Sequence, residues 1–434
     1  MRKAHVILTV LLLFSPILFV NAPSYGANTV KIGVLYPLTG GAADEGRELR
    51  AGAELAAEIA NNIMPINMDM ARRAGISSLG GAKIELIFKD HEGNPTLGAD
   101  QAKKLILDDK VAGIMGCYQS SVTKAVSAVC EQYGIPMIND SSTSPALTQR
   151  ELQWFWRTTP NDMTFTKDFF ELLKGLSEGK VKGVPAVPKQ QIAKLASACE
   201  KTEWGSQVSE TIDAFAKQYG FEVKKALLYA AKSPDLSSEV RSLQTAKPDA
   251  MLFACYASDA ILMVKTLMAQ KVSAKIVWGQ DAGFEVREFW TTLGDDVVGI
   301  LTRTVFAPKV AEVKKVSGQV NAIYKVKHGQ DLSGASARAF TGVQAWVEVL
   351  QKAGSTKPEA IQQAANSISI PGDQLIVPWA GIKFASGKEN KGQNELGSGI
   401  IGQYQKDKAG KIVLEIIYPF DLATANTIYP FKSF

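Results

Sequence analysis

The chain has 434 residues, of which 46% are hydrophobic and 21% charged, and a formal net charge of +5. This near-balanced charge gives no electrostatic reason to expect a nucleic acid or a membrane surface as partner, and the length predicts two domains or more. The four cysteines, Cys117, Cys130, Cys199 and Cys255, are too few for a disulfide scaffold in a chain of this size, although one or two bridges stay open.

The first 27 residues predict a secretory signal peptide. Arg2 and Lys3 precede an apolar run at positions 6 to 20, and small residues follow up to Ala27. A membrane anchor is the competing interpretation, but about fifteen apolar residues fall short of the roughly 20 that a membrane-spanning helix requires. We therefore expect cleavage near Ala27, which would lower the formal net charge to +3. No cysteine precedes Cys117, so no lipid anchor is expected, and the mature protein should be free in the periplasm.

Apolar, strand-like runs alternate with helical patterns in two successive series. The first series predicts strands at Val30–Tyr36, Ile84–Phe88, Val111–Met115 and Ile135–Ile138. The second series predicts strands at Ile192–Ala198, Val223–Tyr229, Ala250–Ala254 and Lys275–Trp278. Such alternation is typical of parallel sheets with crossover helices. The sequence therefore predicts an α/β fold with two similar Rossmann-like lobes, each built on a parallel central sheet.

The last third of the chain has a mixed pattern. Helices are predicted at Val310–Lys327, Ser336–Lys352 and Pro358–Asn366, and a late β pair at Gln403–Gln405 and Ile412–Tyr418. Two polar stretches are predicted to be loops, Asn61–Gly81 and Gly387–Gly399.

The usual motifs of catalysis and metal binding are missing. Beyond the signal peptide the histidines are His91 and His328, with no second histidine or cysteine at metal-ligand spacing, so we interpret His91 as part of a solvated turn. No phosphate-binding loop, Cys-x-x-Cys pair or Gly-x-Ser-x-Gly elbow occurs. Ser121 and Lys124 fit the Ser-x-x-Lys pattern of penicillin-recognising enzymes, but the partner motifs of that class do not occur. The sequence thus predicts no enzyme, no metal site and no cofactor.

Hydroxyl-bearing side chains cluster after two neighbouring predicted strands. Ser120 and Ser121 stand at the start of a helix, whereas Ser141, Ser142 and Thr143 follow the next strand. In a parallel sheet both loops lie at the carboxyl edge, where ligands bind in open α/β folds. The free N–H groups and the dipole of a helix start suit a carboxylate there. The alternative interpretation is that these residues only cap helices.

Several motifs occur in a characteristic order: KIGVLYPLTGGAADEG, KDHEGNP, the serine-rich stretch Gly116–Thr148, and FWRTTPND. In this order they resemble the branched-chain amino-acid (Leu/Ile/Val-binding) type of periplasmic solute-binding proteins, which deliver ligands to ABC importers. The resemblance continues more weakly through CEKTEWG, AMLFACY and WGQDAG, and covers most of Val30 to Phe306.

The resemblance implies a type I periplasmic binding fold with a three-segment hinge. The expected connections between the lobes are Arg157–Pro160, Thr304–Pro308 and Pro378–Phe384. The N-terminal lobe would comprise residues 28–157 and 306–378, and the C-terminal lobe residues 160–304 and 383–434. Cys199 and Cys255 would then lie close together at the ends of neighbouring strands, with a disulfide less expected than free thiols.

The resemblance also implies a ligand site. Ser120 and Thr143 match hydroxyls that hold the ligand carboxylate, and Ser141 matches a residue whose carbonyl accepts from the ligand ammonium. Trp204 and Tyr256 match aromatic residues that cover the ligand, with core packing as the alternative for each. Asp281 matches an acid that pairs with the ammonium, with a turn or cap as the alternative.

Two features depart from the family pattern. Glu45 stands where amino-acid binders often have an aromatic or other pocket-wall residue, and Asn61–Gly81 is longer than the usual connection. An unpaired acid is costly beside an aliphatic ligand. The sequence therefore favours a ligand with a polar or amine-bearing side group over plain leucine.

The leading hypothesis is a monomeric solute-binding protein that closes on an amino acid or related small carboxylate and presents it to an ABC permease. One alternative is a ligand-sensing receptor module of the same fold, although such modules usually carry a membrane span or a fused signalling domain. The other is an exported hydrolase, which the missing motifs disfavour.

Overall fold

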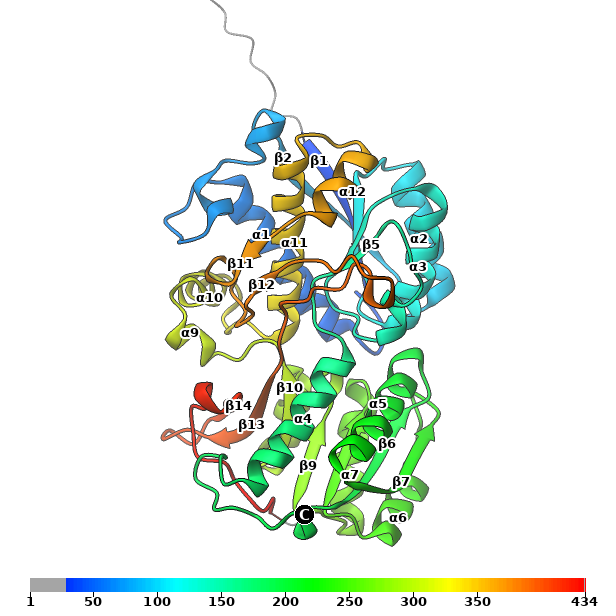
Figure 1. The fold of residues 1–434 in the computed structure, drawn as a ribbon, viewed down its shortest axis with the longest axis vertical. Coiled ribbons are helices and arrows are strands. Elements are labelled where there is room, and N and C mark those ends of the chain that lie inside the picture. The colour runs from blue at the N-terminus through cyan, green and yellow to red at the C-terminus, as the bar shows by residue number, and fades with distance from the viewer. Residues whose placement is uncertain (1–28, 433) are drawn as a thin grey trace, which may run out of the picture.

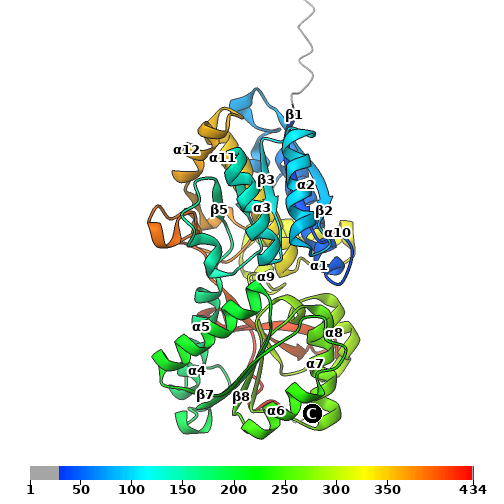
Figure 2. The same ribbon diagram turned by 90° about the vertical axis from the view of Figure 1, so that its right-hand side faces the viewer.

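A computed structural model describes residues 29–432 and 434, so the expected signal peptide lies outside the described part of the chain. The polypeptide forms two α/β lobes stacked along the long axis of the molecule (Figure 1). Each lobe has a central sheet with helices on both faces, as the view turned by 90° shows (Figure 2). Both predicted series of strands are present, and the predicted α/β class is confirmed.

The N-terminal lobe (N-lobe) is built on a five-stranded parallel sheet with the strand order β2-β1-β3-β4-β5. The strands are β1 (Thr29–Tyr36), β2 (Lys83–Asp90), β3 (Gly113–Gly116), β4 (Met137–Asn139) and β5 (Phe155–Arg157). The helices that follow the first three strands in the chain are α1 (Ala43–Asn61), α2 (Pro95–Leu107) and α3 (Ser120–Tyr133). Helix α1 packs against one face of the sheet, and α2 and α3 pack against the other.

The C-terminal lobe (C-lobe) has a seven-stranded sheet with the order β14-β13-β10-β9-β8-β6-β7. Its parallel strands are β6 (Lys194–Glu200), β7 (Glu222–Tyr229), β8 (Ala250–Ala254), β9 (Ile276–Gly279) and β10 (Leu301–Thr304). The predicted late β pair is β13 (Ile400–Lys406) and β14 (Ile412–Tyr418), which extends this sheet in antiparallel fashion. The covering helices are α4 (Asp162–Ser177), α5 (Glu203–Tyr219), α6 (Ser237–Ala246), α7 (Ala257–Gln270) and α8 (Arg287–Leu293).

After β10 the chain returns to the N-lobe. Its helices there are α9 (Val310–Val313), α10 (Lys315–His328), α11 (Gly334–Ala353) and α12 (Pro358–Asn366). The single helix predicted at Val310–Lys327 is therefore two, because the backbone is extended at Lys314. A two-stranded sheet of β11 (Ile370–Pro371) and β12 (Gly381–Ile382) follows.

Three segments connect the lobes, and the third differs from the prediction. The first lies between β5 and α4, and the second follows Thr304, as expected. Pro378–Phe384, however, stays within the N-lobe, because Ile382 pairs with Ile370 and Phe384 packs into the N-lobe core. The chain reaches the C-lobe sheet only after Asn394, through residues 395–399.

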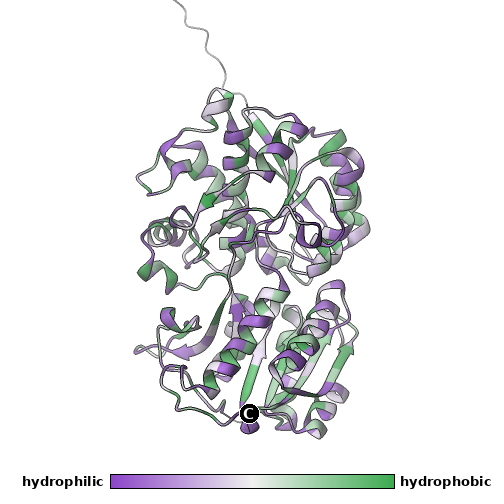
Figure 3. Ribbon diagram, viewed as in Figure 1, coloured by the Kyte–Doolittle hydropathy of each residue, from purple (hydrophilic) through white to green (hydrophobic). Residues whose placement is uncertain are grey.

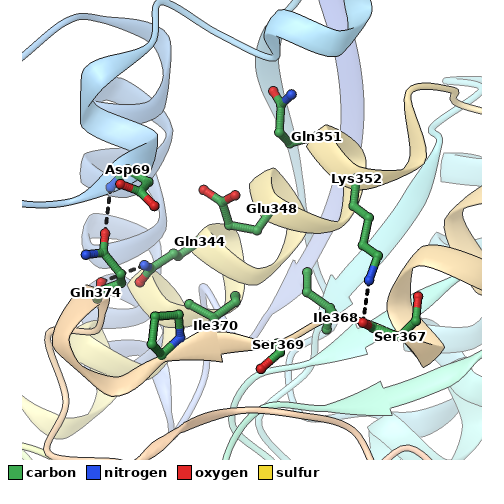
Figure 4. A pocket seen from close by; sticks show the side chains of 11 residues that line it. Asp69, Gln344, Glu348, Gln351, Lys352, Ser367, Ile368, Ser369, Ile370 and Gln374 are labelled. Atoms are coloured by element: carbon green, nitrogen blue, oxygen red, sulfur yellow. Dashed lines mark hydrogen bonds between the residues drawn. The ribbon is translucent and has the colours of Figure 1, made fainter.

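The predicted loop Asn61–Gly81 is largely packed against the N-lobe. It contains two short 3-10 helices, and Ile66, Met68, Met70 and Ile76 are buried. A cavity of about 300 Å³ lies between this segment, α11 and the start of β11. Figure 4 shows the side chains that line it. Its polar walls bond to one another: Asp69 N–H donates to Gln374 Oε1 at 2.8 Å, and Gln344 Nε2 donates to the Gln374 carbonyl at 2.7 Å. The segment Asn61–Gly81 thus adds buried side chains to the core of the N-lobe.

The hydrophobic core lies on both faces of each sheet. Hydrophobic residues run along the central strands, whereas the helices show mixed faces (Figure 3). In β6, for example, Leu195 and Cys199 face the core beneath α4 and α5, and Ala196 and Ala198 face the opposite core. In the described part of the chain, no helix is both long and apolar enough to span a membrane.

The predicted proximity of Cys199 and Cys255 is confirmed. Strands β6 and β8 are neighbours, and Cys199 pairs in register with Ala254, one residue before Cys255. Both thiols are buried and free.

The interpretation of His91 as part of a solvated turn is wrong. The imidazole is fully buried, with Nε2 at 3.2 Å from the Cys117 carbonyl oxygen and Nδ1 accepting from Gly93 N–H. Burial lowers its pKa to about 4, so the ring is neutral near pH 7. The side chain holds the turn after β2 against the β3–α3 loop.

Close packing of α1 on α11 yields a test of the fold. A Cβ on Gly52 would lie 2.0 Å from the Ser336 carbonyl oxygen, which is backbone and cannot turn aside. We expect Gly52→Ala to lower the free energy of unfolding by about 1–3 kcal/mol or more, as overpacking does. Gly41→Ala is the matched control, because no atom lies within 4 Å of its Cβ. Equal urea-unfolding midpoints for both variants would contradict this packing.

Candidate functional site

The predicted ligand residues gather where the carboxyl ends of the strands of the two lobes face each other. From the N-lobe, Ser120 begins α3, and Ser141 and Thr143 follow β4. From the C-lobe, Trp204 lies in the first turn of α5 after β6, and Tyr256 and Asp281 follow β8 and β9. The parallel topology brings these residues together.

The loop after β4 is fixed by its own hydrogen bonds. Asn139 Oδ1 accepts from the N–H groups of Ser141 and Ser142 at 3.0 and 2.9 Å, and Asn139 Nδ2 donates to the Ser142 carbonyl at 2.9 Å. The Ser142 hydroxyl bonds to the Tyr118 carbonyl and lies 2.5 Å from Thr123 Oγ1. Ser142 is therefore structural, and it joins the two hydroxyl-bearing loops into one surface.

Ser120 and Thr143 carry buried hydroxyls with long hydrogen bonds. Ser120 Oγ accepts from Ser144 N–H at a long 3.4 Å, and Thr143 Oγ1 accepts from Arg303 Nη2, also at 3.4 Å. Both residues are 2–3% exposed. The N-cap residue of α3 is Gln119, and its side chain makes no capping hydrogen bond. The N–H groups in the first turn of α3, beside Ser120, therefore have no side-chain acceptor from the N-cap. Hydroxyls beside a helix start suit a carboxylate oxygen.

Three aromatic rings meet across the cleft. Tyr256 lies 5.2 Å from Trp204 and 5.7 Å from Tyr118, measured between ring centroids. Tyr118 comes from the N-lobe and has φ of 119°, a conformation that non-glycine residues rarely adopt. Tyr118 was not among the predicted site residues, although it stands two residues before Ser120. Trp204 Nε1 is buried without a hydrogen-bond partner among the described residues, and so leaves a donor for a ligand.

The partners of Asp281 differ from the ligand ammonium that the resemblance to the family implied. Its Oδ1 lies 2.7 Å from Arg338 Nη2, and its Oδ2 lies 2.7 Å from Arg303 Nη1. Although burial opposes ionisation, the two guanidinium groups lower the pKa of Asp281. Its backbone is also unusual, with φ of 62° and ψ of −148°. The acid expected to meet a ligand ammonium is thus already held by two buried cations.

Further acids complete this buried charge network. Arg338 Nη1 lies 3.1 Å from Glu285 Oε1, and Arg303 Nη2 lies 3.4 Å from Asp162 Oδ1. Burial, together with the charge of Asp281, raises the pKa of Glu285 well above its usual range. Sequence reasoning missed both arginines, because they lie on β10 and α11, and no motif joins them to Asp281.

Glu45 is buried at the first turn of α1. Its Oε1 lies 3.4 Å from the Tyr118 hydroxyl, and its Oε2 has no hydrogen-bond partner in the described chain. Burial raises its pKa to about 7. Nearby, a cavity of about 410 Å³ lies between the lobes, lined by α1, α8 and the end of α10, including Glu48, Arg287 and His328.

Arg157 links the first and third connections between the lobes to the loop after β4, which carries Thr143. Its Nε donates to Gln393 Oε1 at 2.7 Å, and its Nη1 donates to the Ser144 carbonyl at 2.7 Å. Asn394 N–H donates to the Arg157 carbonyl at 2.9 Å. The first and third connections and the loop that carries Thr143 therefore share one buried cation.

Lys124 of the Ser-x-x-Lys pattern pairs with Glu203 of the C-lobe at 3.0 Å. Among residues 29–432 no group of three or more His, Cys, Asp or Glu side chains is placed to hold a metal ion. The arrangement can bind a polar solute between two lobes.

Comparison with known proteins places the chain in a family. Residues 29–395 match the model of the periplasmic binding protein family, and the chain belongs to it. The Leu/Ile/Val-binding protein homolog 7 of Brucella suis biovar 1 is 27% identical over 405 residues, which cover 92% of this chain and 93% of that protein. Homolog 8 of Brucella abortus (strain 2308) is 29% identical over 402 residues, 92% of each chain.

Solved structures share the fold. A leucine-binding protein from Thermotoga maritima aligns with a TM-score of 0.72 and 19% identity, over 91% of this chain and all of that one. The solute-binding protein of an ABC transporter from Rhodopseudomonas palustris BisB5, in complex with 3,4-dihydroxybenzoic acid, gives the same TM-score and identity over 93% and 98% of the two chains. The predicted membership in the branched-chain amino-acid type of binding protein is confirmed.

Titration of Glu45 predicts a pH dependence of stability. Its pKa is about 7 in the folded protein against an ordinary 4.5, so the folded state holds more protons between these values. The free energy of unfolding should therefore fall as the pH rises from 4.5 to 7. Glu45→Gln cannot ionise, so its stability relative to the unaltered protein should rise over this interval by up to about 3 kcal/mol.

Urea unfolding at pH 4.5 and pH 7 measures this difference. Glu54→Gln, on the exposed side of α1, is the matched control and should leave the pH dependence unchanged. Parallel pH profiles for the unaltered protein and Glu45→Gln would show that Glu45 is hydrated in the folded state.

Proposed function

We propose that the protein is the periplasmic solute-binding component of an ABC importer and closes on a small carboxylate. The observation that carries this proposal is the placement of Ser120, Thr143 and the start of α3 opposite Trp204 and Tyr256 of the other lobe. One lobe offers donors to an anion, and the other offers aromatic surface and a free indole N–H. A ligand between them contacts both lobes only when the lobes are together.

The relatives support a carboxylate as the ligand. Two Brucella relatives are named as homologs of Leu/Ile/Val-binding proteins. Structural neighbours were solved with 3,4-dihydroxybenzoic acid, 4-hydroxybenzoate, benzoate and isoleucine. These ligands differ in shape and in the presence of an amine, but each carries a carboxylate.

Transport follows from a shift in the open–closed equilibrium. Because a bound ligand makes contacts with both lobes, it stabilises the closed form relative to the open one. The closed form then docks on a permease in the cytoplasmic membrane. In this proposal the signal peptide is removed, the mature protein acts as a monomer in the periplasm, and it releases its ligand chemically unchanged.

Thr143 gives a direct test of the carboxylate subsite. The probes are leucine, isoleucine, benzoate and 4-hydroxybenzoate, measured by isothermal titration calorimetry. We expect at least one to bind, and Thr143→Ala to weaken it about ten- to a hundredfold, because a hydrogen bond to a charged group is lost. Thr245→Ala, on the exposed face of α6, should bind as the unaltered protein does. Equal affinities for the two variants would remove Thr143 from the site.

A further inference from the structure

The charge network around Asp281 bears on the chemical class of the ligand. Asp281 Oδ1 accepts a hydrogen bond from Arg338 Nη2 at 2.7 Å, and Asp281 Oδ2 forms an ion pair with Arg303 Nη1 at the same distance. Arg303 and Arg338 are 0% exposed, and Asp281 is 4% exposed. The three residues come from β10, α11 and the end of β9, so the packing of both lobes holds them in place.

We propose that Arg338 is a specificity-determining residue that takes the place of a ligand ammonium, so that the site selects carboxylates without an α-amine. The inference rests on the proposed function, since it assumes that a carboxylate binds at Ser120 and Thr143. A zwitterionic ligand needs an anion to balance its ammonium, and the charge of the acid after β9 is already balanced by two guanidinium groups, one at each oxygen. An amine-free acid needs no such anion.

Displacement of either arginine by a ligand ammonium is disfavoured. An expelled guanidinium would remain buried with one acid partner fewer, and breaking a buried ion pair in this way is strongly unfavourable. Arg303 also packs over the ring of Phe165, with Cζ 3.8 Å from the ring centroid. The network therefore resists the rearrangement that an amino acid would require.

Three other acids near this site each engage one oxygen and leave the second without a hydrogen-bond partner among the described residues. Glu285 Oε1 pairs with Arg338, Asp162 Oδ1 accepts from Gln280 at 2.8 Å, and Glu200 Oε1 accepts from Tyr256 N–H at 2.7 Å. Burial raises the pKa of Glu285, Asp162 and Glu200, which disfavours the anion that a ligand ammonium needs. Glu45 also keeps one oxygen without a partner among the described residues, but it lies beside Tyr118 at the α1 edge rather than after a C-lobe strand. Its free oxygen suits a hydroxyl or other donor on the distal part of the ligand.

Binding of matched pairs of acids tests the inference. Each pair contains an amino acid and its amine-free counterpart: leucine and 4-methylpentanoate, phenylalanine and 3-phenylpropanoate, 4-hydroxyphenylglycine and 4-hydroxyphenylacetate. Calorimetry with the unaltered mature protein should show the amine-free member bound at least about tenfold more tightly in every pair that binds. Equal or tighter binding of the amino acids would overturn the inference and leave the proposed function intact. Binding of neither member in any pair would overturn both.

A variant of Arg338 sharpens the test. Arg338→Met frees Asp281 Oδ1 and should shift the ratio of affinities towards the amino acids by at least about tenfold. Arg338→Lys, which keeps the positive charge, should retain the preference for amine-free acids. A merely structural role of Arg338 would weaken both members of a pair equally and leave the ratio unchanged, which would overturn the assignment. If Arg338→Met fails to fold, the comparison of pairs on the unaltered protein still decides.

Discussion

The buried ion pairs of Asp281 with Arg338 and Arg303 join the two lobes beside Thr143, in the candidate functional site. Arg338 belongs to a helix of the N-lobe, whereas Asp281 and Arg303 belong to the C-lobe. Charges at such depth need partners, because an isolated ion in the interior is very costly. The network therefore constrains how β9, β10 and α11 approach each other. It also explains how Asp281 can keep a backbone conformation with φ of 62°.

Arg157 provides a second link, which joins the connections between the lobes to the loop after β4 that carries Thr143. Its guanidinium bonds to Gln393, next to the third connection, and to the carbonyl of Ser144, next to Thr143. Burial lowers its pKa to about 9, and its hydrogen bonds go to neutral oxygens rather than to carboxylates. These hydrogen bonds tie the third connection to the segment that carries Thr143, as the proposed closure of the two lobes on a ligand requires.

The sequence predicted those elements of the fold that depend on local patterns of apolar and polar residues. Long apolar runs such as Val30–Tyr36 predicted buried parallel strands, and parallel topology then placed Ser120 and Thr143 at the carboxyl edge of one sheet. Trp204 and Tyr256 were predicted only from the resemblance to the family. The short strands β5 and β10 were missed, because three or four residues carry little periodicity. Arg303 and Arg338 were also missed, since only tertiary packing joins them to Asp281. His91 was misjudged because a turn sequence does not reveal that another loop covers it.

The identity of the solute that the protein carries tests the account most directly. The mature protein, purified without denaturation and then unfolded, should release its ligand for mass spectrometry. We expect about one equivalent of a small carboxylic acid without an amine, and the signal should fall in Thr143→Ala but not in Thr245→Ala. Release of an amino acid in the same amount would contradict the role assigned to Arg338. Release of a neutral sugar or a cation would contradict the carboxylate site itself.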